Sequence, residues 1–205
     1  MIQIIEYKTS DSNVPWNELS SVLRNAFKER TEQGLLFSCR DFSAEELKES
    51  SGDGFVFVGK DDTDKLLGLM VLTVFSDNTG YLQFVATEPS LKHSGVASAL
   101  FKALIQKCKD LNLDNLGSST ADGATSSVRW HLKMGFKKYS YYSSPKTNYY
   151  SYVFRYQLKE RKYYTVKRLF KFSWNKIFTK ITKTPDGTWR FPFLVKIFRN
   201  LLLKK

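Results

Sequence analysis

The stretch Tyr81–Leu113, YLQFVATEPSLKHSGVASALFKALIQKCKDLNL, decides how the rest of the chain is arranged. Its first part, Tyr81–Thr87, is short and largely apolar, which predicts a buried strand that ends before Pro89. After a polar turn comes Gly95, and from Val96 onward apolar residues recur at helical spacing while lysines face away. The stretch therefore predicts a strand, a tight loop and a helix.

The loop before this helix has the features of a phosphate-binding turn. A helix that begins after a glycine presents unpaired backbone N–H groups and a partial positive charge. Gly95 and Ala97 carry little or no side chain, so the backbone can come close to an anion. The spacing by itself also fits an ordinary strand–helix turn without a ligand, and this alternative stays open.

Two motifs resemble those of the GNAT N-acetyltransferases. The segment Lys92–Ala97, KHSGVA, fits the family pattern Gln/Arg-x-x-Gly-x-Gly/Ala, and Thr87–Pro89 stands where the family has a strand ending in Val-x-Pro. The segment Ser127–Phe136, SVRWHLKMGF, resembles the family's later motif Ala-x-x-Phe-Tyr-x-Lys-x-Gly-Phe. Both motifs occur in the family's order, which strengthens the resemblance. The resemblance covers roughly residues 1–158.

The resemblance implies an α+β fold, in which an α/β/α arrangement of helices flanks a mixed sheet, as in GNAT-like acyl-CoA acyltransferases. Hydrophobic periodicity agrees with the element order that it implies. We expect Asn13 to cap the first helix, Ser43 and Glu46 to form a capping box, and Gly135 to end the last helix of this domain. The expected strands are 2–8, 55–58, 66–75, 81–87, 115–120, 137–142 and 149–158, and the expected helices are 16–30, a short one after 43, one after 95, and 124–134.

By the same resemblance the co-substrate is acetyl-CoA. The loop would hold its pyrophosphate through backbone N–H groups, and the end of the central strand would hold the acetyl carbonyl and the pantetheine arm. No metal is expected, because the two histidines and two cysteines form no group with metal-ligand spacing. The residues expected to bind acetyl-CoA are Val85, Ala86, Thr87, Lys92, His93, Ser94, Gly95, Val96, Ala97 and Ser98.

Three residues are the main candidates for proton transfer. Asp122, just after the fifth predicted strand, is a further candidate for the base, with capping of the loop as its alternative role. His131 stands where the family has a tyrosine acid, and an imidazole with a pKa near 6.5 can protonate a thiolate at neutral pH; the alternative is a core or supporting role beside Trp130. Where relatives carry a glutamate base, the central strand offers Tyr81, which titrates near 10, and Glu88 lies beyond the strand. Proton removal through water, or binding of an amine that is already neutral, stays open.

These features predict an acyl-CoA-dependent N-acyltransferase that moves an acetyl group from acetyl-CoA to a primary amine of an unknown acceptor. The family's tyrosine and glutamate are replaced, and Ala124 stands at the spacing of its asparagine. The alternative is therefore a non-catalytic module that binds CoA or takes part in assembly, with the C-terminal tail binding a partner.

The positive charge lies at the end of the chain. The 205 residues have a net charge of +12. Residues 1–158 contain equal numbers of basic and acidic side chains, whereas residues 159–205 contain 14 Lys and Arg against only Glu160 and Asp186. This change of composition predicts a boundary between an acyltransferase domain, 1–158, and a basic tail, 159–205.

The tail predicts two basic amphipathic helices. In Tyr163–Ile181 and again in Phe193–Lys205, apolar residues follow a helical stripe and lysines take the other side. Such helices are typical of anchors that lie in an anionic membrane surface, where each cation adds about 1 kcal/mol. The stripes could instead fold back on the domain or pair in a homodimer, and their width disfavours nucleic acid as the partner.

Composition also predicts a location. The longest apolar run, Leu66–Phe75, is too short to cross a membrane, and the N-terminus lacks the basic and apolar regions of a signal peptide. Cys39 and Cys108 lie far apart and do not suggest a disulfide framework. We therefore expect a cytoplasmic protein whose tail can make it peripheral at the inner face of the membrane.

Overall fold

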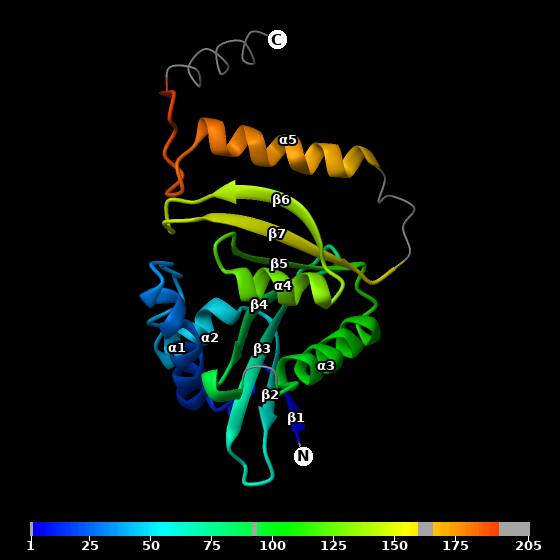
Figure 1. Ribbon diagram of the computed structural model, residues 1–205. Coiled ribbons are helices and arrows are strands. Elements are labelled where there is room, and N and C mark those ends of the chain that lie inside the picture. The colour runs from blue at the N-terminus through cyan, green and yellow to red at the C-terminus, as the bar shows by residue number, and fades with distance from the viewer. Residues whose placement is uncertain (1, 92–93, 160–165, 193–205) are drawn as a thin grey trace.

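A computed structural model describes residues 2–91, 94–159 and 166–192 (Figure 1). Within these ranges the helices and strands follow the predicted order, and most of their ends lie within a few residues of the predicted ones. The elements are β1 Gln3–Lys8, α1 Trp16–Glu32, α2 Ala44–Ser51, β2 Gly54–Lys60, β3 Leu66–Val74, β4 Thr79–Thr87, the 3-10 turn η1 Pro89–Leu91, α3 Val96–Asp110, β5 Asn115–Ala121, α4 Thr125–Lys133, β6 Lys137–Ser143, β7 Tyr150–Gln157 and α5 Val166–Thr182.

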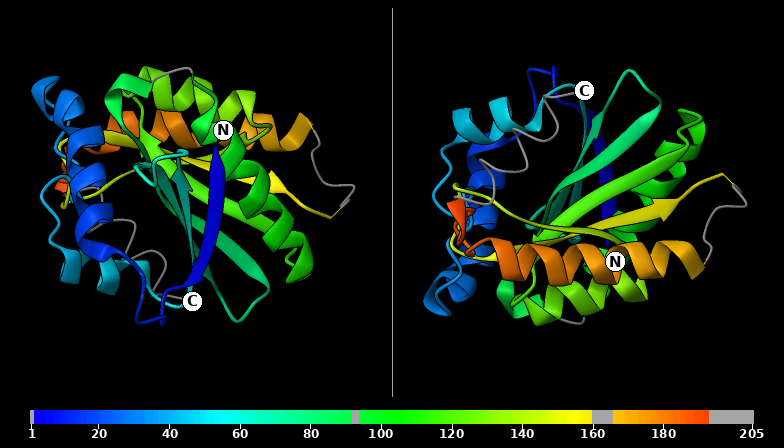
Figure 2. Two further views of the ribbon diagram at one scale, coloured as in Figure 1. Left: turned by 90° about the horizontal axis from the view of Figure 1, so that it is seen from below. Right: turned by 90° about the horizontal axis from the view of Figure 1, so that it is seen from above.

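The strands form a seven-stranded mixed sheet in the order β1-β2-β3-β4-β5-β7-β6. Neighbouring strands are antiparallel except β4 and β5, which run parallel because α3 connects them. The hairpin strand β7 lies between β5 and β6, so β6 forms an edge. The predicted α+β fold with helices on both faces of a mixed sheet is confirmed (Figures 1 and 2).

The inner strand β3 shows why helices must cover both faces of the sheet. Leu69 and Val71 belong to the core beneath α1 and α2, whereas Met70 and Leu72 belong to the core beneath α3. All four are fully buried, as expected when a strand with alternating side chains is covered on both faces. Each such side chain stabilises the fold by about 1.5–3 kcal/mol through burial.

Local signals at helix ends are confirmed in two places and wrong in one. Ser43 and Glu46 form the predicted capping box of α2, and Gly135, with φ of +91°, follows the end of α4. The predicted cap Asn13 is wrong, because Pro15 occupies the N-cap position of α1 and no side chain caps that end. Proline suits a helix start, since its missing N–H would be unpaired there anyway.

The two parallel strands separate where the chemistry is expected. Strands β4 and β5 pair only from Thr79 with Asn115 to Leu82 with Ser118, although both continue beyond that point. Gln83 is an extra residue in β4, because Leu82 pairs with Leu72 while Phe84 already pairs with Val71. A bulge of this kind bends a strand and ends its pairing on one side. The edge of β4 beyond the bulge therefore has no strand partner on the β5 side.

Helix α5 lies along the edge strand β6 (Figure 1). Its polar side chains make hydrogen bonds to this part of the sheet. The Oδ1 atom of Asn175 accepts a 2.7 Å hydrogen bond from the Tyr141 N–H, and the Thr179 hydroxyl donates to the Tyr141 carbonyl at 3.3 Å. Two residues one helical turn apart thus pair the backbone N–H and carbonyl of Tyr141. At an open sheet edge these two groups would be free to pair with another strand. Lys176 adds a 2.7 Å hydrogen bond to the hydroxyl of Tyr152 on β7.

The opposite side of α5 is exposed and apolar. Phe170 is 72% exposed and Trp174 is 71% exposed, although both are large apolar side chains. The idea that the predicted stripe folds back on the domain is therefore wrong for α5, because polar side chains and Phe172, which lies outside the stripe, make that contact instead. The exposed stripe consists of Leu169, Phe170, Trp174, Ile177, Phe178 and Ile181.

Part of the predicted tail lies outside the described residues, namely the second helix at 193–205. The boundary between residues 158 and 159 stays a prediction. In the part of the chain that is described, no helix has both the length and the apolar composition needed to cross a membrane.

Candidate functional site

A large cleft opens where β4 and β5 separate. It has a volume of about 620 Å³, and it is formed by the end of α1, the end of β4, the start of α3 and the first part of α4. Its walls are mostly small or polar near α4 and apolar along β4. The lining residues are Ala26, Glu29, Arg30, Gln33, Val85, Ala86, Thr87, Pro89, Ala97, Gly123, Ala124, Thr125, Ser126, Ser127, Arg129 and Trp130.

The start of α3 beside this cleft has the geometry of an anion site. Gly95 is the N-cap residue and has φ of +90°, a conformation that costs other residues about 1–2 kcal/mol. A Cβ atom at Gly95 would meet no other atom within 4 Å, so the site has room for a side chain. Glycine is favoured there because of the positive φ angle. The first-turn N–H groups of α3 have no partner inside the helix, and Ala97 in that turn lines the cleft. These groups suit the diphosphate of a nucleotide coenzyme.

The ten residues expected to bind acetyl-CoA fall into four groups. Lining the cleft are Val85, Ala86, Thr87 and Ala97. Exposed beside it are Ser94, Gly95 and Ser98. Val96 is buried in the core, so only its backbone is available to a ligand, and Lys92 and His93 lie outside the described residues.

A smaller inner cavity of about 250 Å³ adjoins the large cleft. Arg30, Val85 and Ser127 line both spaces and so mark their junction. The other walls come from the loop after α1, from β4 and β5 around the point where their pairing ends, from α4, and from β6, β7 and the loop between them. A donor in the cleft and an acceptor in the cavity would therefore meet at this junction.

One side chain joins the two loops that close the inner cavity. The Asn148 amide donates to the Gly34 carbonyl at 2.7 Å, and its Oδ1 atom accepts from the Leu36 N–H at 3.0 Å. These partners are more than 110 residues away along the chain. The acceptor side of the site is thus assembled by long-range contacts.

His131 lies in the wall of the inner cavity and is only 3% exposed. Its Nδ1–H donates to the Ser127 carbonyl at 2.8 Å, which leaves Nε2 to accept from the Ser118 hydroxyl at 3.0 Å. The ring stacks on Phe154 at 4.6 Å. Burial lowers the pKa of His131 to about 4, so the imidazole is neutral at neutral pH. This geometry favours the supporting role over that of an acid, since the acid role had assumed a pKa near 6.5.

The two candidates for the base are separated by the fold. The Tyr81 hydroxyl lies 2.7 Å from the Ser119 hydroxyl in the inner cavity, and burial raises the pKa of Tyr81 above its usual value. It therefore stays protonated at neutral pH. Glu88 lines neither the cleft nor the cavity, and its N–H donates to the Leu67 carbonyl at 3.0 Å. The structure brings Tyr81 and His131 to the same cavity and leaves Glu88 outside it.

Sequence reasoning missed the cationic group at the junction. The guanidinium of Arg30 lies 4.6 Å above the Phe27 ring and 5.6 Å from the Phe37 ring, and it makes no ion pair within the described residues. Burial lowers its pKa from the usual value. Tyr149 closes the other side of the Phe37 ring at 4.9 Å. No sequence signal marks Arg30, because an arginine near a helix C-terminus is ordinary.

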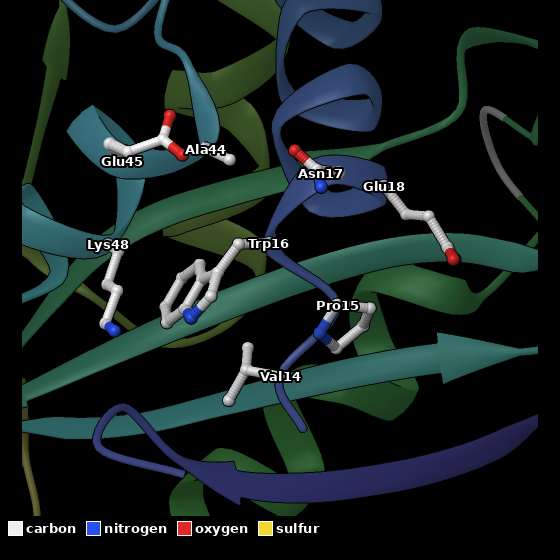
Figure 3. A pocket seen from close by; sticks show the side chains of 8 residues that line it. All are labelled: Val14, Pro15, Trp16, Asn17, Glu18, Ala44, Glu45 and Lys48. Atoms are coloured by element: carbon white, nitrogen blue, oxygen red, sulfur yellow. The ribbon is translucent and has the colours of Figure 1, made fainter. Parts of the chain in front are cut away.

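A separate hollow of about 400 Å³ lies at the starts of α1 and α2. Figure 3 shows the Trp16 indole there, between Lys48 and Val14. Trp16 and Arg30 are at opposite ends of α1, roughly 20 Å apart at 1.5 Å per residue. This hollow is therefore not part of the site. In the described ranges, no group of three or more His, Cys, Asp or Glu side chains is placed to hold a metal ion.

Comparison with known proteins agrees with this geometry. Residues 16–136 match the model of the Acetyltransferase (GNAT) family. Similar folds include the ribosomal-protein-S18-alanine N-acetyltransferase from Escherichia coli, with a TM-score of 0.62 and 13% identity over 80% of this chain and 99% of that chain. Ard1 from Thermoplasma volcanium gives a TM-score of 0.59 and 17% identity over 78% and 99%. A GNAT family acetyltransferase from Elizabethkingia anophelis with acetyl-CoA bound gives a TM-score of 0.56 and 17% identity over 76% of this chain and 97% of that chain. No curated protein matches the chain in sequence.

Proposed function

Because the chain belongs to the GNAT acetyltransferase family, we propose that it transfers an acetyl group from acetyl-CoA to a primary amine of an acceptor. In this reaction the amine nitrogen forms a bond to the acetyl carbon and the bond from that carbon to sulfur breaks. The nitrogen loses a proton and the CoA sulfur gains one. The observation that carries the proposal is the gap between β4 and β5 beside the glycine-capped start of α3.

The lining of the large cleft supports binding of the coenzyme there. Acetyl-CoA supplies an activated thioester, and the chain supplies positioning. The free N–H groups at the start of α3 suit the diphosphate, and the unpaired edge of β4 at Val85–Thr87 suits the amide-bearing pantetheine arm and the acetyl carbonyl. Holding the thioester at Val85 places the acetyl group at the junction with the inner cavity.

The inner cavity supports binding of the amine in its neutral form. Within the described residues no carboxylate lines this cavity, and Tyr81 keeps its proton. Deprotonation must then occur before the amine reaches the acetyl group, or through water. Cationic Arg30 at the junction favours loss of the amine proton, because it disfavours a second positive charge nearby.

Turnover with a panel of primary amines tests this function. The full chain should release free thiol from acetyl-CoA only when an acceptor is present, and mass spectrometry should find the acceptor heavier by one acetyl group. Titration calorimetry with acetyl-CoA gives the second measurement. Binding of acetyl-CoA without any turnover would favour the alternative, a non-catalytic CoA-binding or assembly module.

We also propose that α5 attaches the enzyme to an anionic membrane surface. The support is an exposed apolar stripe with Lys171 and Lys180 at its borders, in a segment whose net charge of +12 complements acidic lipids. A second copy of the chain would bring an equal positive charge against the stripe, which disfavours a homodimer through this face. A cytoplasmic location stays a prediction.

A further inference from the structure

The charged side chains that line the inner cavity are all positive among the described residues. Two cationic side chains line it, Arg30 from α1 and Lys146 from the loop between β6 and β7. Within the described residues its wall contains no aspartate or glutamate, and its other polar groups are mainly hydroxyls. Such a wall attracts an anion and repels a molecule with several positive charges.

Among the described residues, Arg30 is held in place by an aromatic contact and no ion pair, and the neighbouring Glu29 acts on it only through electrostatic attraction. Its guanidinium stacks on Phe27 at 4.6 Å, it is half-buried, and no carboxylate among the described residues pairs with it. Removing a guanidinium from water without a partner costs free energy, which a bound anion would offset. The planar fork of arginine matches a carboxylate with two parallel hydrogen bonds.

The position of Arg30 limits where that anion lies relative to the reacting amine. Arg30 shares the junction with Val85 and Ser127, next to the place proposed for the acetyl group. A carboxylate held by Arg30 is therefore close to the nitrogen that attacks. This closeness of amine and carboxylate is the defining feature of an amino acid.

On the premise of the N-acetyl transfer proposed above, we propose that the acceptor is a small amino acid, and that Arg30 selects it by binding its carboxylate. The α-amine of a free amino acid is largely protonated at neutral pH, because its own carboxylate stabilises the ammonium form. Pairing of that carboxylate with Arg30 weakens this effect and favours loss of the amine proton. An acidic wall would repel the carboxylate, so the absence of Asp and Glu from the described cavity wall agrees with this acceptor, and a polyamine would meet two cations and no carboxylate in that described wall.

Matched acceptor pairs test the proposal. The full chain is given acetyl-CoA with glycine, alanine, leucine or β-alanine, and in parallel with the amide of each. Loss of the carboxylate removes the charge-assisted hydrogen bonds to Arg30, so kcat/KM calculated on the neutral form of each amine should be about 10- to 100-fold higher for at least one acid than for its amide.

Variants at Arg30 assign the preference to that side chain. In Arg30→Gln the ratio of kcat/KM for acid over amide should fall about 10-fold or more, while the KM for acetyl-CoA changes little. Arg30→Lys should restore part of the ratio, because it keeps the charge and loses the planar fork. Lys28→Gln is the matched control, because it removes a charge from an exposed residue of α1 that lines neither space.

Two kinetic results would overturn the acceptor proposal while the acetyl transfer stands. One is equal or better turnover of the amides or of diamines. The other is an equal fall of kcat/KM for acid and amide in Arg30→Gln, which would place Arg30 on the thioester.

A binding measurement decides the cavity's preference without turnover. With CoA present, calorimetry compares N-acetylalanine and N-acetylleucine with their amides. We expect the acids to bind more tightly in the wild type and the difference to vanish in Arg30→Gln. If acetyl-CoA binds but no amine is acetylated, the enzyme proposal fails. If the acids and their amides bind equally well, the proposal of a carboxylate site at Arg30 fails, whatever the result of the turnover assay.

Discussion

At the residue scale, His131 shows how burial changes the chemistry that a motif suggests. Its position in the second motif invites an acid role, yet both ring nitrogens are used inside the protein, by the Ser127 carbonyl and the Ser118 hydroxyl. The pKa of about 4 means that the ring holds α4 against β5 as a neutral group.

The lowered pKa of His131 predicts a specific dependence of stability on pH. Between about pH 6.5 and about pH 4 the unfolded chain binds a proton at His131 that the folded chain does not, so stability falls as the pH falls. From about pH 7 to about pH 4.5 this amounts to about 2 kcal/mol. Denaturant unfolding of wild type and His131→Phe at several pH values should show their difference shrinking by this amount toward low pH. Parallel pH curves would contradict the assignment.

Gly95 gives a second prediction at this scale. Gly95→Ala should raise the KM for acetyl-CoA about 5-fold and lower the free energy of unfolding by about 1 kcal/mol, because alanine resists φ of +90° and the N–H groups turn away. Gly34→Ala is the control: Gly34 has φ of +80°, equally open space around its Cβ position, and lines neither the cleft nor the cavity. It should lose similar stability and keep its KM for acetyl-CoA. Equal KM values for both variants would remove the α3 amides from coenzyme binding.

At the element scale, α5 is oriented opposite to an ordinary amphipathic helix, which turns its apolar side toward the core and its polar side toward water. Its polar residues Asn175 and Thr179 pair with the edge of β6, and its apolar stripe is exposed. Large exposed apolar patches are typical of interaction surfaces. The helix covers the sheet edge with one side and leaves its apolar stripe exposed on the other.

The membrane proposal predicts that Trp174→Glu abolishes sedimentation of the full chain with vesicles rich in anionic lipid. The glutamate removes apolar area from the centre of the stripe and adds a repelled charge. Unfolding curves should stay close to wild type, since Trp174 is exposed. The control Ser50→Glu, at an exposed position of α2 away from the stripe, adds the same charge and should weaken binding much less.

Other results with vesicles would count against a membrane partner. Equal sedimentation with neutral and anionic vesicles would remove the electrostatic part of the proposal. A wild-type dimer in solution that Trp174→Glu dissociates would assign the stripe to a second copy of the chain instead.

At the scale of the whole molecule, the site depends on contacts between distant parts of the chain. Asn148 joins the loop after α1 to the loop before β7 through two hydrogen bonds. Asn148→Ala should therefore raise the KM for the acceptor about 3- to 10-fold, at about 0.5–1.5 kcal/mol for a lost hydrogen bond, and leave the KM for acetyl-CoA unchanged. Steady-state kinetics with each substrate varied in turn make the measurement. A rise in both constants would mean that the loops support the whole fold rather than the acceptor cavity.

The sequence by itself determined the elements, their order and the glycine at the start of α3, because hydrophobic period, capping and glycine placement act over a few residues. The strand 66–74 and the Ser43 capping box are examples, and both are observed. Only the tertiary structure decided that Arg30 stands beside Val85, that His131 is buried and neutral, and that α5 turns its apolar side outward. These depend on which distant groups meet and how much water they exclude, and no local pattern carries that information.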